Sequence, residues 1–237
     1  MMPSANNINP LNYVNIIQWN VRSLPARLPS LQNLLSYHKC SIALLSETWL
    51  LPSRSLSIPN FKIYRSDRSD GYGGVAVAIH SSLKSKLILI DNITRNRFTN
   101  LKIDIIGVEV VLSDLSPPLK VWSCYLPSSS SIPVNLWHDL FSIVTQNTLL
   151  CGDFNAFHSA WGSVLSSRRG NLIYNTINSL GLCILNDGSS THVGRPGSSD
   201  SAIDLSFCSP DISWYLSWRT LGEPHGSDHI PIIVTAK

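Results

Sequence analysis

Apolar positions in this chain fall into short runs that are separated by polar turns. Most of these runs have the length of a strand that is buried on both faces, and β-branched residues are frequent in them. The pattern therefore predicts a strand-rich protein. The expected strands cover residues 13–19, 42–46, 61–65, 74–80, 87–90, 101–112, 119–125, 149–151, 182–186, 202–208 and 230–235.

Helical periodicity appears in only a few segments. Leucines recur at helical spacing in residues 25–36, and residues 134–146 and 171–180 also favour helices. Gly181 supplies the residue that commonly ends a helix. Many strands with few helices are typical of the α+β class.

One apolar run ends in a group of side chains that suits catalysis. Residues 149–151 stop at Gly152, and Asp153 and Asn155 follow at positions i and i+2. Side chains two apart on a strand share a face, so the carboxylate and the carboxamide would lie together. The carboxylate accepts protons, and the carboxamide both donates and accepts hydrogen bonds. This pair suits activation of a water molecule beside a phosphate oxygen.

Four further apolar runs carry polar residues of the same kind. Asn20 ends one run and Glu47 ends another, Asp204 lies inside a third, and the step Asp228-His229 precedes a fourth. A lone Gly-Asp-x-Asn stretch is usually a turn, but chance does not explain five such placements. The sequence therefore predicts one polar site built from strand ends.

The order of these motifs resembles the endonuclease/exonuclease/phosphatase superfamily, which includes DNase I and the apurinic endonucleases. The motifs are Gln-Trp-Asn, Ser-Glu-Thr, Gly-Gly-Val-Ala, Tyr-Leu-Pro, Gly-Asp-Phe-Asn, Ile-Asp-Leu and Ser-Asp-His. Within the superfamily, residues 155–162 and 201–205 resemble the endonuclease domains of non-LTR (LINE-type) retrotransposons. The resemblance covers roughly residues 14–235. It implies a DNase I-like fold with four layers, in which a two-sheet β-sandwich has helices on both sides (α/β/β/α).

The resemblance also implies the catalytic residues. They are Asn20, Glu47, Tyr125, Asp153, Asn155, Asp204, Asp228 and His229. Glu47 and Asp228 are the expected ligands of Mg²⁺, with Mn²⁺ as the alternative ion, because hard cations prefer carboxylate oxygens. Asp228 is also the expected partner that fixes the ring of His229, and Asp204 would support that pair. His229 would contact the scissile phosphate.

The other catalytic positions have narrower expected roles. Asp153 would orient or deprotonate the attacking water, and Asn155 would hold a phosphate oxygen. Asn20 would orient Asp153 or the metal shell. Tyr125 would contact the phosphate, although a core aromatic at a strand end is the simpler alternative.

Four residues are expected to bind substrate. Thr191 and Ser227 would place hydroxyls on the phosphate, unless they only stabilise turns. Arg195 lies in the loop 192–201, which in LINE-type relatives enters a DNA groove. Arg22 stands where apurinic endonucleases usually carry an aspartate, so a second metal ligand from this strand is doubtful and Arg22 could meet DNA phosphate instead. Further candidates for contacts to the DNA backbone are Arg65, Arg68, Arg168 and Arg169.

Composition and charge bear on the substrate, the state of the cysteines, membrane spans and the number of domains. The net charge of the 237 residues is only +3, but a basic rim around four acidic site residues would fit a polyanionic substrate. The five cysteines are scattered without a Cys-x-x-Cys pair, which indicates reduced thiols and no zinc site. No apolar stretch has the length of a membrane span. The motifs extend from Asn20 to His229, so residues 13–237 should form one domain after a flexible tail, 1–12.

The expected function is a Mg²⁺-dependent DNA endonuclease of a LINE-type retrotransposon. By resemblance it nicks one strand of double-stranded target DNA and leaves a 3′-hydroxyl that primes reverse transcription. The expected partner is the reverse transcriptase domain of the same polyprotein, of which this chain would be an isolated N-terminal domain. We expect a monomer that is intracellular and acts in the nucleus, without membrane contact.

Three alternatives remain at this level. A cellular apurinic or general DNA nuclease of the same superfamily is the nearest. A phosphatase of inositol lipids, or a sphingomyelinase, would share the catalytic core. A non-catalytic DNA-binding module would bind DNA without magnesium and would not nick it.

Overall fold

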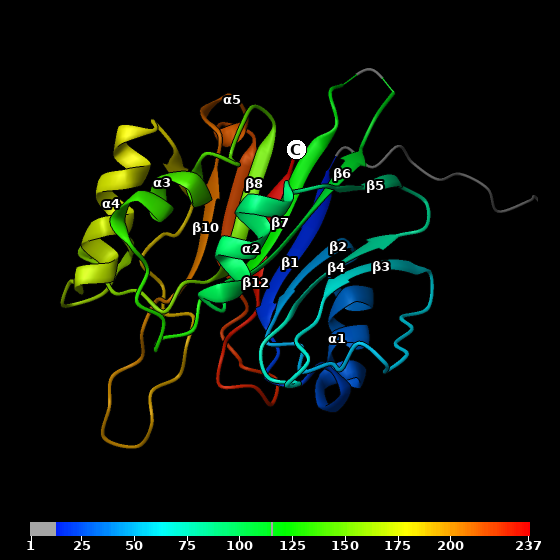
Figure 1. Ribbon diagram of the computed structural model, residues 1–237. Coiled ribbons are helices and arrows are strands. Elements are labelled where there is room, and N and C mark those ends of the chain that lie inside the picture. The colour runs from blue at the N-terminus through cyan, green and yellow to red at the C-terminus, as the bar shows by residue number, and fades with distance from the viewer. Residues whose placement is uncertain (1–12, 115) are drawn as a thin grey trace, which may run out of the picture.

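Two six-stranded sheets form the centre of the protein (Figure 1). The computed structural model describes residues 13–114 and 116–237; the predicted tail 1–12 lies outside the described residues. In the first sheet the strand order is β11 (Leu216–Thr220), β12 (Ile232–Ala236), β1 (Val14–Asn20), β2 (Cys40–Ser46), β4 (Val75–His80) and β3 (Phe61–Ser66). In the second it is β5 (Lys84–Ile88), β6 (Asp104–Val111), β7 (Leu119–Tyr125), β8 (Thr148–Asp153), β10 (Asp204–Cys208) and β9 (Cys183–Ile184).

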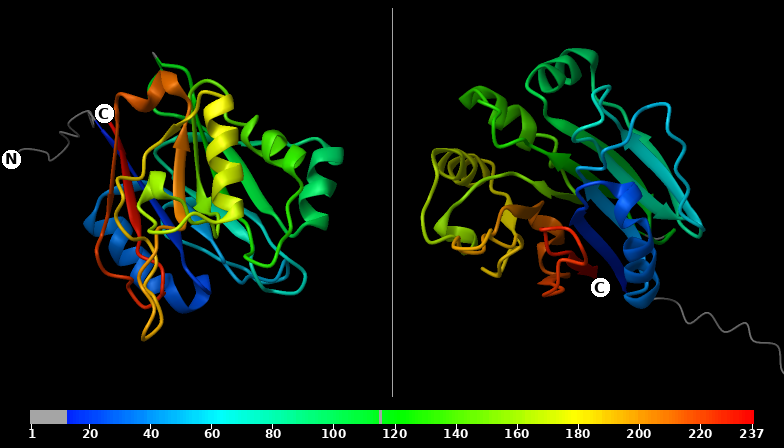
Figure 2. Two further views of the ribbon diagram at one scale, coloured as in Figure 1. Left: turned by 90° about the vertical axis from the view of Figure 1, so that its left-hand side faces the viewer. Right: turned by 90° about the horizontal axis from the view of Figure 1, so that it is seen from below.

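Helices cover the outer face of each sheet. Figures 1 and 2 show α1 on one side of the paired sheets and α3 and α4 on the other. The longer helices are α1 (Leu24–Tyr37), α2 (Asn92–Asn100), α3 (Val134–Phe141) and α4 (Arg168–Ser179), and the short ones are η1 (Ser159–Trp161) and α5 (Pro210–Ser213). The predicted four-layer α/β/β/α sandwich is confirmed.

The alternation of strand side chains separates the three hydrophobic cores. In β1, Ile16 packs between the two sheets, whereas its neighbour Ile17 packs under α1. In β8, Leu149 faces the first sheet and Leu150 faces the α3 and α4 side. Strands that are buried on both faces read as continuous apolar runs, which explains the pattern in the sequence.

The topology brings several strand ends to one edge of the sandwich. β1 and β2 run parallel, with Asn20 beside Ser46, and β7 and β8 run parallel, with Tyr125 beside Asp153. β10 enters antiparallel to β8, so that Asp204 lies opposite Asp153. Parallel neighbours end on the same side of a sheet, and both parallel pairs end at this edge.

Some elements differ from the expectation. α2 and β11 were not predicted, α3 ends at Phe141 rather than at 146, and the strand expected at 182–186 is only two residues long. α2 is polar and buries a single side chain, Phe98, so it lacks an apolar stripe. The Asp91 side chain caps its N-terminus. β11 is an edge strand with no fully buried residue. Neither element produces a strong hydrophobic pattern.

A buried glutamine links the two sheets below the site. Gln18 of β1 donates to the carbonyls of Gly152 (3.2 Å) and Leu205 (3.3 Å), and it accepts from the Ser206 hydroxyl at 2.6 Å. We expect Gln18→Leu to lower the free energy of unfolding by about 3 kcal/mol, because buried polar groups lose their partners. Urea unfolding measures this change, and Gln146→Leu, at an exposed position, is the matched control. A loss no larger than in the control would contradict the prediction.

No helix within residues 13–114 or 116–237 has both the length and the apolarity of a bilayer span. All five cysteines are unpaired, as the sequence predicted, and four of them are buried.

Candidate active site

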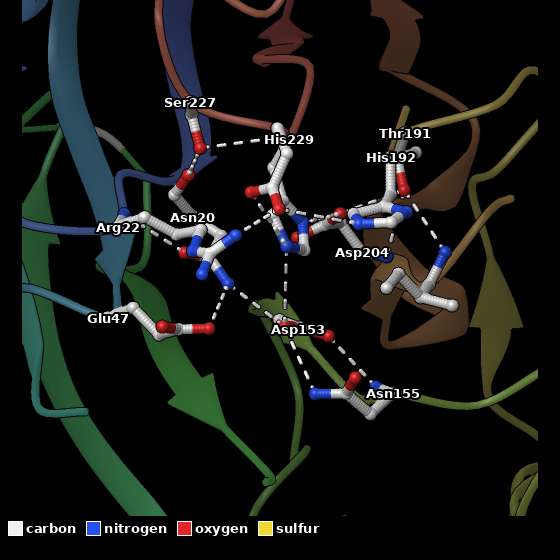
Figure 3. Close-up of polar contacts among 12 residues, drawn as sticks. Asn20, Arg22, Glu47, Asp153, Asn155, Thr191, His192, Asp204, Ser227 and His229 are labelled. Atoms are coloured by element: carbon white, nitrogen blue, oxygen red, sulfur yellow. Dashed lines mark hydrogen bonds and ion pairs between the residues drawn. The ribbon is translucent and has the colours of Figure 1, made fainter. Parts of the chain in front are cut away.

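Asn20 joins two carboxylates at the edge where the strand ends meet (Figure 3). Its amide nitrogen donates to Glu47 Oε1 and to Asp153 Oδ2, both at 2.9 Å. Asn20 ends β1, Glu47 follows β2 directly, and Asp153 ends β8 in the facing sheet. One carboxamide therefore fixes a half-buried and a fully buried carboxylate, which confirms that these three predicted residues lie together.

Asp153 is the most enclosed acid of the group. Its side chain is 1% exposed, and its Oδ1 accepts from the backbone N–H of Asn155 at 2.9 Å. Burial, followed by the neighbouring Asp204 carboxylate, raises the pKa of Asp153 well above its ordinary value. A carboxylate in this state gains stability from any cation placed beside it, and it is a better base than an exposed aspartate.

His229 faces Asp153 from the other side of the site. Its Nε2 lies 3.9 Å from Asp153 Oδ2, and its Nδ1 lies 2.7 Å from Asp204 Oδ2. Burial alone would lower the pKa of His229, but the charge and hydrogen bond of Asp204, aided by Asp153 and Asp228, raise it to about 9. The ring is thus cationic near neutral pH, with Nδ1–H held by Asp204 and Nε2–H turned toward the site.

The partner that fixes the ring is Asp204, not Asp228 as predicted. Adjacent residues in extended chain point to opposite sides, so Asp228 cannot reach the Nδ1 of its own neighbour. Its carboxylate instead lies 3.8 Å from Nε2 of His229, forms an ion pair with Arg22 and lies 3.7 Å from His192.

Thr191 does not present its hydroxyl to a substrate, contrary to the prediction. The residue is fully buried, and its Oγ1 donates to Asp204 Oδ2 at 2.8 Å. The same oxygen accepts from the backbone N–H groups of Ile203 and Asp204. Thr191 therefore positions Asp204, which in turn positions His229.

Tyr125 and Asn155 complete the inner wall. Tyr125 lies at the end of β7, where burial, followed by Glu47, raises its pKa, so its hydroxyl stays protonated and can donate. Asn155 has a positive φ of 47°, which turns its side chain back toward Asp153. Its amide nitrogen donates to the Leu126 carbonyl and to Asp153 Oδ2. Its amide N–H groups are thus directed at protein oxygens in this structure.

The other residues that were predicted to bind substrate lie around these catalytic side chains. Ser227 Oγ donates to the Asn20 carbonyl at 2.8 Å and accepts from the His229 N–H, so it ties the last loop to β1. Arg195 is exposed in a turn of the hairpin 192–201, which projects from the edge of the sandwich (Figure 1). Arg22 is exposed beside Asp228.

Three of the other arginines have structural partners. Arg65 pairs with Asp67, and Arg68 pairs with Asp104. Arg169 donates to carbonyls of the loop 126–130. Only Arg168 of this set is exposed on the surface.

Two neighbours of the site were missed from the sequence. His192 lies next to Thr191 and packs edge-on against His229, with ring centroids 4.7 Å apart. Trp19 donates its indole N–H to the His229 carbonyl at 2.9 Å and so fixes the backbone of the catalytic loop. Both flank residues that the sequence had singled out, but nothing in their local pattern signals a contact to His229.

Two sets of side chains could hold a cation. Ligand atoms of Glu47, Asp153 and His229 lie within 4.8 Å of one another, and so do those of His192, Asp228 and His229. Glu47 and Asp228, which were predicted to share one ion, fall into different sets. The Glu47 and Asp153 oxygens fit a hard divalent cation, because the two carboxylates are close together and mostly shielded from water.

Comparison with known proteins shows which proteins the chain resembles. Residues 119–233 match the family described as Endonuclease-reverse transcriptase. Two relatives from Drosophila melanogaster are the probable RNA-directed DNA polymerase from transposon BS, 25% identical over 95% of this chain, and the RNA-directed DNA polymerase from mobile element jockey, 27% identical over 91%. The chain therefore resembles this endonuclease family over just under half of its length, and it resembles these mobile-element proteins over nearly all of it. It spans only 24% and 23% of the length of these two relatives.

Solved structures share the fold of this chain. The endonuclease domain of TRAS1, a telomere-specific non-LTR retrotransposon, has a TM-score of 0.76 at 20% identity, with 95% of this chain and 98% of that chain covered. The AP endonuclease from Leishmania major has a TM-score of 0.74 at 13% identity, with 99% and 91% covered. The DNase I-like fold is therefore shared, and the family that residues 119–233 match is one of endonucleases.

Proposed function

We propose that this protein is a Mg²⁺-dependent endonuclease that nicks one strand of double-stranded DNA and leaves a 3′-hydroxyl. The observation that carries the proposal is the assembly of Asn20, Glu47 and Asp153 opposite the Asp204–His229 pair. This arrangement supplies a base, a cationic hydrogen-bond donor and a pair of carboxylates for a metal ion around one point. Those are the elements that hydrolysis of a phosphodiester requires.

The side chains divide the chemistry between them. Asp153, which Asn20 holds in place, orients the attacking water and takes its proton. His229 directs Nε2–H at a phosphate oxygen, where the negative charge grows as the water attacks. Glu47 and Asp153 would hold the Mg²⁺, which when bound neutralises charge on the phosphate. Asp204 keeps the ring of His229 in place throughout.

The relatives support the proposed substrate and partners. They are RNA-directed DNA polymerases of mobile elements, and this chain corresponds to about a quarter of their length. The 3′-hydroxyl left by the nick would prime synthesis by the reverse transcriptase region of the same polyprotein, in the nucleus. Arg195 on its projecting hairpin would contact a DNA groove, and Tyr125 would donate to the phosphate.

Nicking of supercoiled plasmid tests this proposal. We expect conversion to open circles with Mg²⁺ and none with EDTA, and we expect a DNA polymerase to extend the nicked product directly, because it carries a 3′-hydroxyl. A His229→Ala preparation, purified in parallel, detects contaminating nuclease. No nicking by folded wild type overturns the proposal. Cleavage of an abasic duplex alone would favour the apurinic endonuclease alternative.

A further inference from the structure

The site has an outer half that is centred on Asp228. Asp228 lies on the loop before β12, and its side chain is 33% exposed. His192 Nε2 lies 3.7 Å from its Oδ2, and His229 Nε2 lies 3.8 Å from its Oδ1. Two imidazoles and one carboxylate with this spacing form a set that could bind a borderline divalent ion such as Mn²⁺ or Zn²⁺, where the ion would displace the Nε2 proton of His229.

The positive charge of Arg22 already neutralises the negative charge of Asp228. The guanidinium of Arg22 forms an ion pair with Asp228 Oδ2, the same oxygen that lies closest to His192. An ion bound there would compete with the guanidinium for this oxygen, and the two positive charges would repel each other at such a short distance.

The backbone directs Arg22 to this position. Arg22 and Ser23 have φ values of 38° and 86°, a sharp turn that immediately follows β1. The Arg22 N–H donates to Asn20 Oδ1 at 3.2 Å, and its guanidinium lies 5.9 Å from the centre of the Trp49 ring. The turn, the hydrogen bond and the ring together hold Arg22 over the site. Figure 3 shows the Arg22 side chain beside Asn20.

We propose that the Arg22 guanidinium takes the place of a metal ion beside Asp228. The site then binds a single divalent ion, at Glu47 and Asp153. Removal of the guanidinium should open a second ion site at His192, Asp228 and His229. The first part rests on the proposed metal-dependent function, and the second depends only on the side chains around Asp228. A guanidinium keeps further N–H donors free, so Arg22 can also neutralise a phosphate that approaches Asp228.

Counting bound Mn²⁺ tests this directly, without reference to nicking. Metal-free protein is titrated with Mn²⁺, and the free ion is measured by electron paramagnetic resonance. We expect one bound ion per chain for wild type and for Arg22→Lys, which keeps the positive charge. We expect two for Arg22→Ala, and one again for the double variant Arg22→Ala/His192→Ala. Arg22 is exposed, so these replacements leave the core intact, and thermal unfolding checks the fold.

The outcomes separate this inference from the proposed function. If Arg22→Ala still binds one ion, the inference that Arg22 replaces a metal ion is wrong, whereas the proposed metal-dependent nuclease activity is unaffected. If wild type binds two ions and Asp228→Ala binds one, the inference is also overturned, because a metal ion then coexists with Arg22. If wild type binds none but Arg22→Ala gains one, the Asp228 part holds and the proposed metal site at Glu47 fails.

Discussion

Replacement of His229 with alanine is expected to slow nicking by about 10³-fold, within the range of 10²–10⁴ for a positioned proton donor or acceptor. The variant loses the cationic Nε2–H, which lies 3.9 Å from Asp153 Oδ2 and would donate to the scissile phosphate. A 10³-fold loss corresponds to about 4 kcal/mol of transition-state stabilisation. The measurement is the single-turnover rate on a labelled duplex with enzyme in excess, at saturating Mg²⁺.

The control for this experiment is His138→Ala on the exposed face of α3. We expect it to nick at the wild-type rate. The fold should survive in His229→Ala, because Trp19 bonds to the backbone carbonyl of residue 229 and not to its ring. A loss of less than tenfold in a folded His229→Ala protein would remove His229 from the chemistry, and the proposed mechanism would need another donor.

The residues of the inner site were predictable because each stands at a strand end. Asn20, Glu47 and Asp153 follow apolar runs, and their assembly requires only that the parallel pairs β1–β2 and β7–β8 end at the same edge. Local pattern gave the residues, and the resemblance to a known superfamily gave the sandwich that joins them. The strand boundaries were predicted well where both faces of a strand are buried.

The contacts around His229 were predicted less well, because they join residues that are distant in sequence. Asp228 precedes His229 in sequence, which suggested a pair, but Asp204, 25 residues away, reaches Nδ1. Thr191 is turned inward by three hydrogen bonds to β10 and the residue that precedes it, so its hydroxyl faces Asp204 and not the solvent. His192 contacts His229 through a backbone bridge between distant loops and through the packing of the two rings. Such contacts depend on the packing of the whole sheet edge and leave no periodic signal.

The two aspartates near His229 should differ sharply when each is changed to asparagine. Asp204→Asn is expected to slow nicking by about 10³-fold, because the amide removes the charge that keeps the imidazole cationic and can hold the ring in the wrong tautomer. Loss of the equivalent charge in the triad of serine proteases slows catalysis by about 10⁴-fold. Asp228→Asn should cost less than about tenfold, since this carboxylate is partly exposed and does not bond to Nδ1.

Single-turnover rates for the two variants, at the same Mg²⁺ concentration, measure the difference. Thr191→Val provides an intermediate test: it keeps the shape of the side chain but removes the hydroxyl that donates to Asp204. We expect its rate to fall between those of the two asparagine variants, because Asp204 keeps its charge but loses one of the bonds that aim it. If Asp228→Asn were slower than Asp204→Asn, then the carboxylate that governs His229 during catalysis would be the one next to it in sequence, and the ring would have to turn when DNA binds.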